Sequence, residues 1–236
     1  VQAAWDWDKR CQFSRDGFCD YGNYGDPLVY AVGDSHIAVH KRSLALFAKR
    51  AHLHLRIFSF SACPYVAKGQ ESEFGEQYLS LDCKRRNLMV SQDMKTNTPV
   101  AVMFAQRSNG ANGKRNASRQ LSAMESSWRI LLDLYPKIRE VVFTPDPERI
   151  EPSLIAGRGS NTWSSAVMTE VKQIQNWAAK RKRTLVVDSF RLICTPVCIP
   201  HRAGFWIYSD GNHLSLEGSK LVFDNNWKRI AAFIRP

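Results

Sequence analysis

The sequence predicts an α/β domain in which helices cover both faces of a central, mostly parallel sheet. Short apolar runs alternate along the chain with segments of helical periodicity, an order typical of β-α-β units. The apolar runs are continuous, as expected of strands that are buried on both faces. The chain has 236 residues, of which 44% are hydrophobic, so it can bury one large core. We therefore expect a three-layer sandwich.

Five apolar runs are expected to form the strands of this sheet. Each lies between segments of different periodicity or composition, and the helical segments between them favour parallel pairing. The expected strands are residues 28–32, 53–58, 99–104, 141–143 and 185–187.

Helices are expected between and after these strands. Apolar residues at steps of three and four mark the clearest of them, as at Val171, Ile174 and Ala178. Ser215 is expected to cap the last helix at its N-terminus. The expected helices are residues 36–50, 80–95, 124–135, 167–178 and 215–234.

The remaining segments are expected to be loops or an extension. Residues 1–27 show no clear period, and we expect a linker or extension that packs on a domain of residues 28–236. Residues 109–119 and 148–161 are rich in glycine, asparagine or proline and predict loops. The chain begins at Val1 without a basic and then apolar leader, so we expect a processed protein or an excised part of a longer one. No run approaches 18 uncharged apolar residues, which predicts no membrane span.

The net charge favours anionic partners. The chain carries 33 Lys and Arg against 22 Asp and Glu, a net charge of +11, which fits a nucleic acid, a lipid surface or an acidic glycan. The densest basic run, residues 180–183, follows an expected helix and is favourable to its dipole. No helix-turn-helix, zinc-finger or RNP-like motif accompanies the charge, so we expect no nucleic-acid partner.

Six cysteines form three pairs of close neighbours in the sequence. Disulfides are favoured over a zinc site at Cys194-x3-Cys198, because no second Cys/His pair follows at finger-like spacing, and over free thiols. Disulfides would place the chain in an oxidising compartment. Although six cysteines allow about 15 connectivities, the favoured pairs are Cys11–Cys19, Cys63–Cys83 and Cys194–Cys198.

The first candidate site is Gly33-Asp34-Ser35-His36, which joins the first strand to the first helix. Ligands of open parallel sheets bind outside the carboxyl ends of the strands. A helix N-terminus there offers free N–H groups that can stabilise an oxyanion. The alternative is that Ser35 or Asp34 only caps the helix.

The second candidate site is Asp210-Gly211-Asn212-His213, before the last helix. A carboxylate and an imidazole three residues apart on a turn can lie side by side, as the base half of a Ser-His-Asp arrangement requires. The alternative is a loop histidine near a surface aspartate. The other five histidines have no such setting in the sequence, and His52 and His54, beside a strand, are expected to be structural.

Together these motifs resemble the SGNH/GDSL hydrolase superfamily over about residues 28–236. Three further segments resemble one branch, the extracytoplasmic SGNH domain fused to acyltransferase-three family membrane proteins that O-acetylate bacterial surface polysaccharides such as O-antigen. These segments are Ser61-Ala62-Cys63-Pro64, Cys194-x3-Cys198 and residues 208–215.

That resemblance implies a flavodoxin-like SGNH fold and a catalytic triad. Ser35 is expected as the nucleophile, His213 as the general base and Asp210 as the residue that orients it. The sequence departs from the superfamily at the oxyanion hole, since residues 59–63 lack the usual glycine and the usual Gly-x-Asn-Asp block is absent. The backbone N–H of Ser35, a backbone N–H near Ala62, and the side chains of Arg107 or Asn109 are the candidate donors.

The resemblance also implies the partners and the location. We expect a polysaccharide or lipid-linked glycan acceptor, an N-terminal membrane acyltransferase domain in the full-length protein, and a periplasmic position tethered to the inner membrane. No metal and no organic cofactor are expected, since the acetyl donor is a substrate. Two alternatives stay open: a secreted carbohydrate acetyl esterase with the same triad, and an inactive glycan-binding module.

Overall fold

A six-stranded sheet forms the centre of the computed structural model, which describes residues 18–106, 117–146, 165–194, 201–210 and 213–235. The strand order is β1-β3-β2-β4-β5-β6. Strands β2 to β6 pair in parallel, and β1 pairs with β3 in the antiparallel sense. The strands are β1 (Cys19–Tyr21), β2 (Leu28–Gly33), β3 (His54–Ser59), β4 (Ala101–Ala105), β5 (Arg139–Phe143) and β6 (Thr184–Val187).

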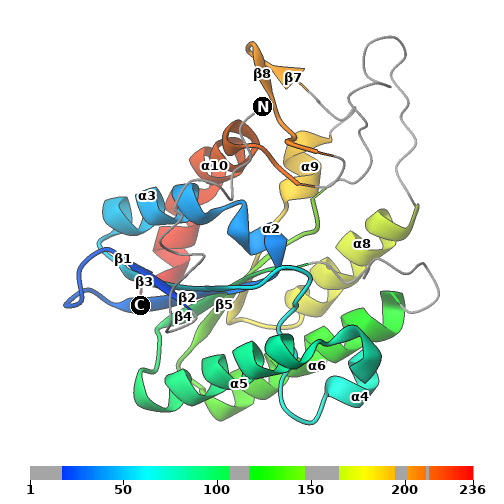
Figure 1. Cartoon of the computed structure of the whole chain (residues 1–236). Coiled ribbons are helices and arrows are strands. Elements are labelled where there is room, and N and C mark those ends of the chain that lie inside the picture. Colours follow the sequence, from blue (N-terminus) through cyan, green and yellow to red (C-terminus); the bar gives the residue numbers. More distant parts are fainter. Residues whose placement is uncertain (1–17, 107–116, 147–164, 195–200, 211–212, 236) are drawn as a thin grey trace.

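Helices cover both faces of this sheet, which confirms the expected three-layer fold. Figure 1 shows α2, α3 and α10 on one face and α5 and α6 on the other. The helices are α2 (Ser35–Ala38), α3 (Lys41–Ala51), α4 (Glu71–Phe74), the 3₁₀ turn η2 (Glu76–Tyr78), α5 (Leu81–Thr96), α6 (Ala117–Leu134), α8 (Ser165–Ala179), α9 (Ser189–Ile193) and α10 (Leu216–Ile234). A short hairpin of β7 (His201–Arg202) and β8 (Phe205–Trp206) precedes α10.

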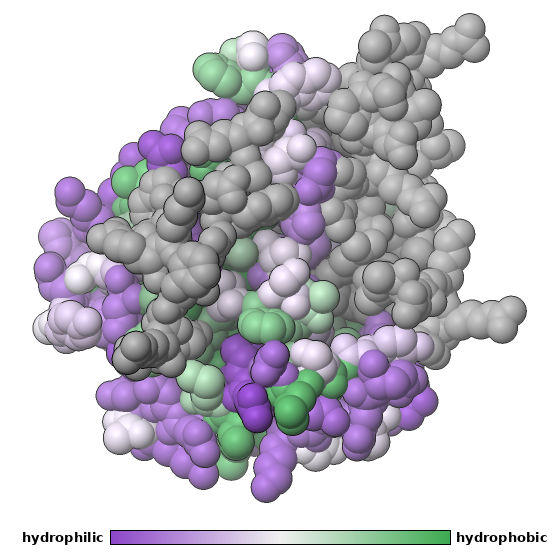
Figure 2. Space-filling view, viewed as in Figure 1, coloured by the Kyte–Doolittle hydropathy of each residue, from purple (hydrophilic) through white to green (hydrophobic). Residues whose placement is uncertain are grey.

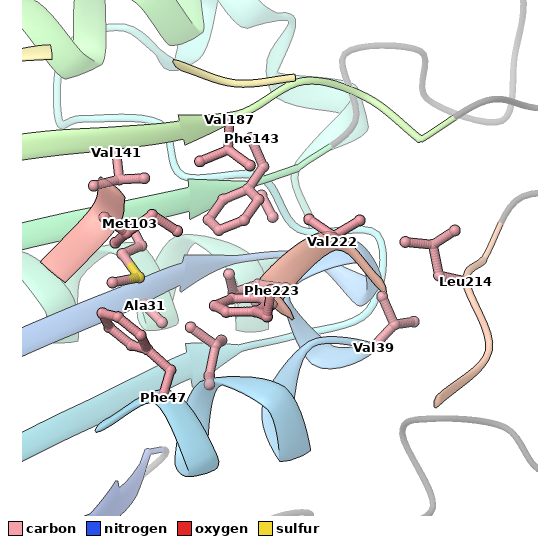
Figure 3. Packing of buried hydrophobic residues seen from close by; sticks show 14 of the residues in the cluster. Ala31, Val39, Phe47, Met103, Val141, Phe143, Val187, Leu214, Val222 and Phe223 are labelled. Carbon is pink, nitrogen blue, oxygen red and sulfur yellow. The ribbon is translucent and has the colours of Figure 1, made fainter. Parts of the chain in front are cut away.

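The two faces of the sheet form two separate apolar clusters. Successive side chains of a strand point to opposite faces, so in β2 Val29 and Ala31 enter one cluster while Tyr30 and Val32 enter the other. Figure 3 shows the first cluster, where Phe223 of α10 packs among side chains of the sheet. Burial on both faces explains why the strands are continuous apolar runs in the sequence.

The structure differs from the expected helix at residues 36–50. The chain forms two helices, α2 and α3, with a break at Val39 and His40. The His40 imidazole is buried and lies 2.9 Å from Ser219 Oγ of α10, so a contact between distant segments fixes the direction of the second helix. Neither Pro nor Gly marks this break in the sequence.

Two further boundaries differ from the expectation. The predicted loop 109–119 runs into α6, which begins at Ala117, and the rest of that loop, like 148–161, lies outside the described residues. Within residues 1–27, the segment Cys19–Tyr21 forms the edge strand β1, which has no periodic signal.

Ser215 is confirmed as the N-cap of α10, where its side chain accepts a hydrogen bond from Gly218 N.

Charged side chains attach β1 to the domain. Arg56 of β3 donates to both carboxylate oxygens of Asp20 at 2.9 Å and to those of Asp93 of α5 at 2.9 and 2.8 Å. These bidentate bonds raise the pKa of Arg56 above its usual value, with the Asp20 bond as the largest cause. The Arg56 guanidinium therefore joins the edge strand β1 to α5, a helix that covers one face of the sheet.

Two arginines of the basic run at 180–183 bond to carbonyl groups near helix ends. Arg181 donates to Trp177 O at 2.7 Å and lies 4.3 Å above the ring of Trp177. Arg183 donates to Leu132 O at 3.1 Å, near the end of α6. Cations at helix C-termini are favourable to the helix dipole, which supports the interpretation that the sequence favoured.

The described surface is predominantly hydrophilic on the face shown in Figure 2. Large exposed apolar side chains in the described part of the chain include Leu81 and Phe205. Among the helices described, none is both long and apolar enough to cross a bilayer.

Gly33 sets the spacing between β2 and β4. A Cβ at this position would lie 2.0 Å from the carbonyl oxygen of Ala105 and 3.1 Å from Cβ of Ile37. The first of these is a backbone atom held in the sheet, so it cannot move aside as a side chain could. The glycine thus lets the strand that carries Ser35 approach its neighbour.

We expect Gly33→Ala to lower the free energy of unfolding by about 1–3 kcal/mol, because the methyl group overpacks a rigid contact. Chemical denaturation measures the change. Gly25→Ala is the matched control, since a Cβ there meets nothing within 4 Å. Equal stability of the two variants would contradict the close approach.

Candidate active site

Ser35, His213 and Asp210 form one chain of hydrogen-bond contacts. Ser35 Oγ lies 2.8 Å from His213 Nε2, although the two residues are 178 positions apart. On the other side of the ring, His213 Nδ1 lies 2.9 and 3.0 Å from the two carboxylate oxygens of Asp210. The structure therefore brings together the three residues that the sequence singled out, in the order that a nucleophile, a base and an orienting carboxylate require.

The connection between β2 and α2 positions Ser35. The strand ends at Gly33, and Asp34 caps the helix by accepting a hydrogen bond from His36 N at 2.9 Å. Ser35 is the first residue of the helix and is half-buried. Capping is therefore the role of Asp34, and the Ser35 hydroxyl faces the imidazole instead.

Backbone bonds on both sides of residues 209–213 position the other two residues. Ser209 N donates to His213 O at 2.9 Å, and Ser215 N donates to Ile207 O at 2.9 Å. The Asp210 carboxylate also accepts from His213 N at 2.9 Å, so it orients both the ring and the backbone of the same residue. A Cβ on Gly218 would lie 2.1 Å from Ile207 O, which shows how closely α10 packs on this segment.

The site is open to solvent on the side of the carboxylate. The Asp210 side chain is 43% exposed, whereas the His213 side chain is 16% exposed. An imidazole that is mostly buried and bonded on both nitrogens has one fixed orientation. With Asp210 as acceptor at Nδ1, Nε2 is left to accept a proton from Ser35.

A turn at the end of β3 lies beside the β2–α2 connection. Cys63 N donates to Phe60 O at 3.2 Å to close the turn, and Phe60 N donates to Gly33 O at 3.3 Å. Within the turn Ala62 has a φ of 52°, a left-handed conformation in which glycine is ordinarily favoured. Ala62 lies in the segment where the sequence lacks the expected glycine. This alanine is exposed to solvent.

The other two oxyanion candidates, Arg107 and Asn109, lie outside the described residues. The described segment that contains β4 ends at Gln106, which is not among the residues that the sequence singles out. Gln106 is buried, and its Oε1 accepts a hydrogen bond from Tyr65 N at 2.7 Å. The glutamine therefore fixes the chain that follows the turn at 60–63.

A disulfide and a buried arginine restrain the turn at residues 60–63. Cys63 and Cys83 are bonded, as their pairing in the sequence favoured. Arg86 donates to the carbonyl and, at 3.0 Å, to the Sγ of Cys63. Burial lowers the pKa of Arg86 to about 10. Disulfide and guanidinium together restrain the residue that follows Ala62.

The remaining cysteines are only partly described. Cys19 and Cys194 are each disulfide-bonded. Their expected partners, Cys11 and Cys198, lie outside the described residues.

Two of the other five histidines lie beside a carboxylate in the fold. His36 Nδ1 lies 3.4 Å from Oδ2 of Asp146, and His54 Nε2 lies 3.4 Å from Oδ1 of Asp20. Both carboxylates are distant in sequence, so no local spacing could have shown them. The ring of His36 also lies 5.3 Å from that of His213, measured between centroids.

His40 is a buried histidine that stays neutral at pH 7. Its Nδ1 lies 2.9 Å from Ser219 Oγ, and its ring packs against Phe143 and Phe223. Burial lowers the pKa of His40 to about 4 from its ordinary value of 6.5. The unfolded chain therefore binds a proton at a higher pH than the folded protein does.

We expect this difference to destabilise the fold in acid. Between pH 6.5 and about 4 the unfolded state gains the proton first, so the free energy of unfolding should fall by about 3 kcal/mol through this group alone. Denaturant unfolding at several pH values should show a shallower fall in His40→Gln, whatever its stability at pH 7. Parallel curves for the two proteins would contradict the assignment.

Comparison with known proteins identifies the family. A family model described as SGNH domain (fused to AT3 domains) matches residues 6–225. No curated protein sequence matches the chain well enough to count as a relative.

Solved structures share the fold at low identity. The periplasmic domain of a lipopolysaccharide acetyltransferase from Salmonella ser. Paratyphi A has a TM-score of 0.69 and 16% identity, over 88% of this chain and 85% of that one. A carbohydrate esterase family 3 protein from Talaromyces cellulolyticus has a TM-score of 0.53 and 14% identity, over 89% and 98%. A family two carbohydrate esterase from Clostridium thermocellum has a TM-score of 0.55 and 11% identity, over 89% and 63%.

Because the family model covers most of the chain, and because the fold and the Ser35, His213 and Asp210 geometry agree with it, this protein belongs to the family of SGNH domains that are fused to AT3 domains.

Proposed function

We propose that this domain is an O-acetyltransferase that moves an acetyl group through an acyl-serine to a hydroxyl of a bacterial surface polysaccharide. The observation that carries the proposal is the unbroken hydrogen-bond chain from Ser35 through His213 to Asp210 in a domain of this family. A serine hydroxyl is a weak nucleophile, and an adjacent base of this kind is what activates it.

The proposed reaction has two half-reactions. Ser35 Oγ attacks the carbonyl carbon of the acetyl donor, and its proton passes to Nε2 of His213. The tetrahedral intermediate collapses when the donor leaves with that proton, and acetyl-Ser35 remains. A sugar hydroxyl then attacks the acyl group while its proton passes to His213. The second tetrahedral intermediate collapses to the acetylated sugar, and Ser35 Oγ leaves with the proton that His213 returns to it. Asp210 orients the imidazole and stabilises its charged form in both halves.

The negative oxygen of the intermediate needs preorganised donors. We propose the backbone N–H of Ser35, at the start of α2, and that of Ala62, whose turn is tied to Gly33. Arg107 and Asn109 remain candidates for a side-chain donor. No resident cofactor is part of this proposal, because the acetyl donor is a substrate.

The relatives support an acceptor and a partner for this reaction. The similar Salmonella structure belongs to a lipopolysaccharide acetyltransferase, which supports a polysaccharide or lipid-linked glycan of O-antigen type as the acceptor. The family description supports an AT3 membrane domain as the partner that brings the acetyl group. We place the domain in the periplasm on the same grounds, and the Cys63–Cys83 disulfide fits an oxidising compartment.

A carbohydrate acetyl esterase is the second candidate. Two of the similar structures are carbohydrate esterases, and the same triad hydrolyses an acyl-serine when water replaces the sugar hydroxyl. The inactive glycan-binding module is less favoured, since binding alone does not need a serine bonded to an imidazole.

The test is intact mass after incubation with an activated acetyl ester, beside Ser35→Ala. We expect the wild type to gain about 42 Da, one acetyl group by covalent catalysis, and the variant to gain nothing. Added glycan should discharge the acyl-enzyme to an acetylated glycan. Discharge to acetate alone would favour the esterase. Glycan binding without any adduct would favour the binding module.

We expect Asp210→Asn to lower kcat for hydrolysis of an activated acetyl ester by about a thousandfold or more, with KM little changed. The amide cannot hold His213 in the same tautomer, although the shape of the site is kept. Asp82→Asn, which removes an exposed carboxylate in the first turn of α5, serves as the matched control. Similar rates for the two variants would contradict the role of Asp210.

A further inference from the structure

The surface that α3 and α10 share is basic. The two helices pack side by side on one face of the sheet (Figure 1). Helix α3 contains no aspartate or glutamate, and its cations are Lys41, Arg42, Lys49 and Arg50. Helix α10 contains two carboxylates, and its cations are Lys220, Lys228 and Arg229. The net charge of the two helices together is therefore positive.

Four exposed side chains lie along one side of α3. Arg42, Leu46 and Lys49 are separated by four and three residues, a spacing that places side chains above one another on a helix. Arg50 is exposed directly after them. Leu46 is 45% exposed, whereas the nearby Leu44 is fully buried. An apolar side chain thus lies in solvent among three cations.

Helix α10 adds an aromatic ring to the same surface. A shallow groove separates the two helices, and its apolar lining consists of Leu46, Phe47, Phe223 and Trp227. Arg50 and Lys220 also line this groove. Nζ of Lys228 lies 5.8 Å from the centre of the Trp227 ring. Apolar groups therefore lie at the middle of the surface, with cations around them.

Carboxylates neutralise only part of this charge. Oδ1 of Asp224 lies 3.7 Å from Arg50 Nη1, and its Oδ2 lies 3.1 Å from Lys220 Nζ. The second carboxylate of α10 lies in the first turn of that helix. Within the part of the chain that the structure describes, Arg42 and Lys49 make no ion pair. The surface therefore keeps cations that are available to an anionic partner.

We propose that this α3–α10 surface binds the headgroups of an anionic phospholipid bilayer. The inference goes beyond acetyl transfer and rests on one part of the proposed function, the membrane partner that keeps the domain close to a bilayer. The residues that we assign to the α3–α10 surface are Arg42, Leu46, Lys49, Arg50, Lys220, Trp227 and Lys228.

The mixture of side chains favours a bilayer over a soluble polyanion. Lysine and arginine near an anionic leaflet are attracted to its headgroups. Leucine and tryptophan are stabilised at the boundary between the headgroups and the acyl chains. An acidic glycan in solution would bind the cations but would gain little from Leu46.

This orientation also brings the active site to the bilayer. Helix α3 begins shortly after Ser35, and α10 begins shortly after His213. Both helices therefore start at the edge of the sheet that carries the proposed triad. A domain that lies on the α3–α10 surface has this edge beside the membrane, where a lipid-linked acceptor is held.

The test is cosedimentation of the intact 236-residue chain with vesicles of phosphatidylcholine, alone or mixed with an equal part of phosphatidylglycerol. We expect binding to the mixed vesicles only, and we expect added salt to weaken it. Arg42→Gln/Lys49→Gln should lower the partition coefficient by about thirtyfold. The matched control is Lys68→Gln/Lys95→Gln, which removes two exposed cations from outside this surface and should lower the coefficient much less.

A second pair of variants separates a bilayer from a soluble polyanion. Leu46→Gln leaves the charge unchanged and should lower binding to the mixed vesicles by about fivefold, because less apolar area leaves water. Leu88→Gln, at a leucine of α5 that is 49% exposed, is its control and should not lower binding. Binding of a soluble acidic polysaccharide through Arg42 and Lys49, without binding to vesicles, would overturn the inference in favour of a glycan.

Equal binding to the two kinds of vesicle, or equal effects of the two cation pairs, would also overturn the inference. Vesicle binding does not involve Ser35, so its outcome is independent of the test of acetyl transfer. A chain that forms the acyl-enzyme but does not bind vesicles contradicts only this inference. A chain that binds the mixed vesicles without forming the acyl-enzyme contradicts only the proposed function.

Discussion

The bond between Ser35 Oγ and His213 Nε2 is the constraint on which the rest of the site depends. It spans 2.8 Å between two segments that are 178 residues apart, so the sheet and α10 must both be placed to within a fraction of an ångström. Two glycines make this possible by letting backbone approach backbone. Gly33 brings β2 against the end of β4, and Gly218 brings the start of α10 against Ile207. The packing of the core therefore determines the geometry of the proposed catalytic chain.

Much of the fold could be predicted from the sequence because its signals are local. Continuous apolar runs gave the parallel strands, and steps of three and four gave the long helices. The Asp210 and His213 pair was found for the same reason, since a spacing of three on a turn brings the two side chains together. The break between α2 and α3 was missed because its cause is the contact of His40 with Ser219, on a helix at the other end of the chain.

The features that escaped the sequence analysis share a dependence on distant partners. Strand β1 has no periodicity of its own and is attached by the bonds of Arg56 to Asp20. Likewise, no local spacing in the sequence pairs His36 with Asp146, which lies beside it in the fold. A lone histidine or a three-residue strand carries too little pattern for its partner to be inferred, because pairing arises only once the core has formed.

Several buried polar groups lie around the proposed active site. His40 packs between apolar rings on one side, while Arg86 and the Cys63–Cys83 disulfide restrain the turn that contains Ala62 on the other. Burying such groups is costly for stability, and the cost is acceptable where a fixed geometry is needed for chemistry. This arrangement holds the backbone around Ser35 rigid while the Asp210 side of the site stays open to solvent.

The central claim is that His213 activates Ser35, and fluorophosphonate labelling tests it most directly. Such a reagent phosphonylates a serine that an adjacent base has activated, whatever the natural acyl donor is. The account predicts one adduct on Ser35 by peptide mapping in the wild type, and a rate at least a hundredfold lower in His213→Gln. Equal labelling of the two proteins, or an adduct elsewhere with Ser35 unmodified, would contradict it.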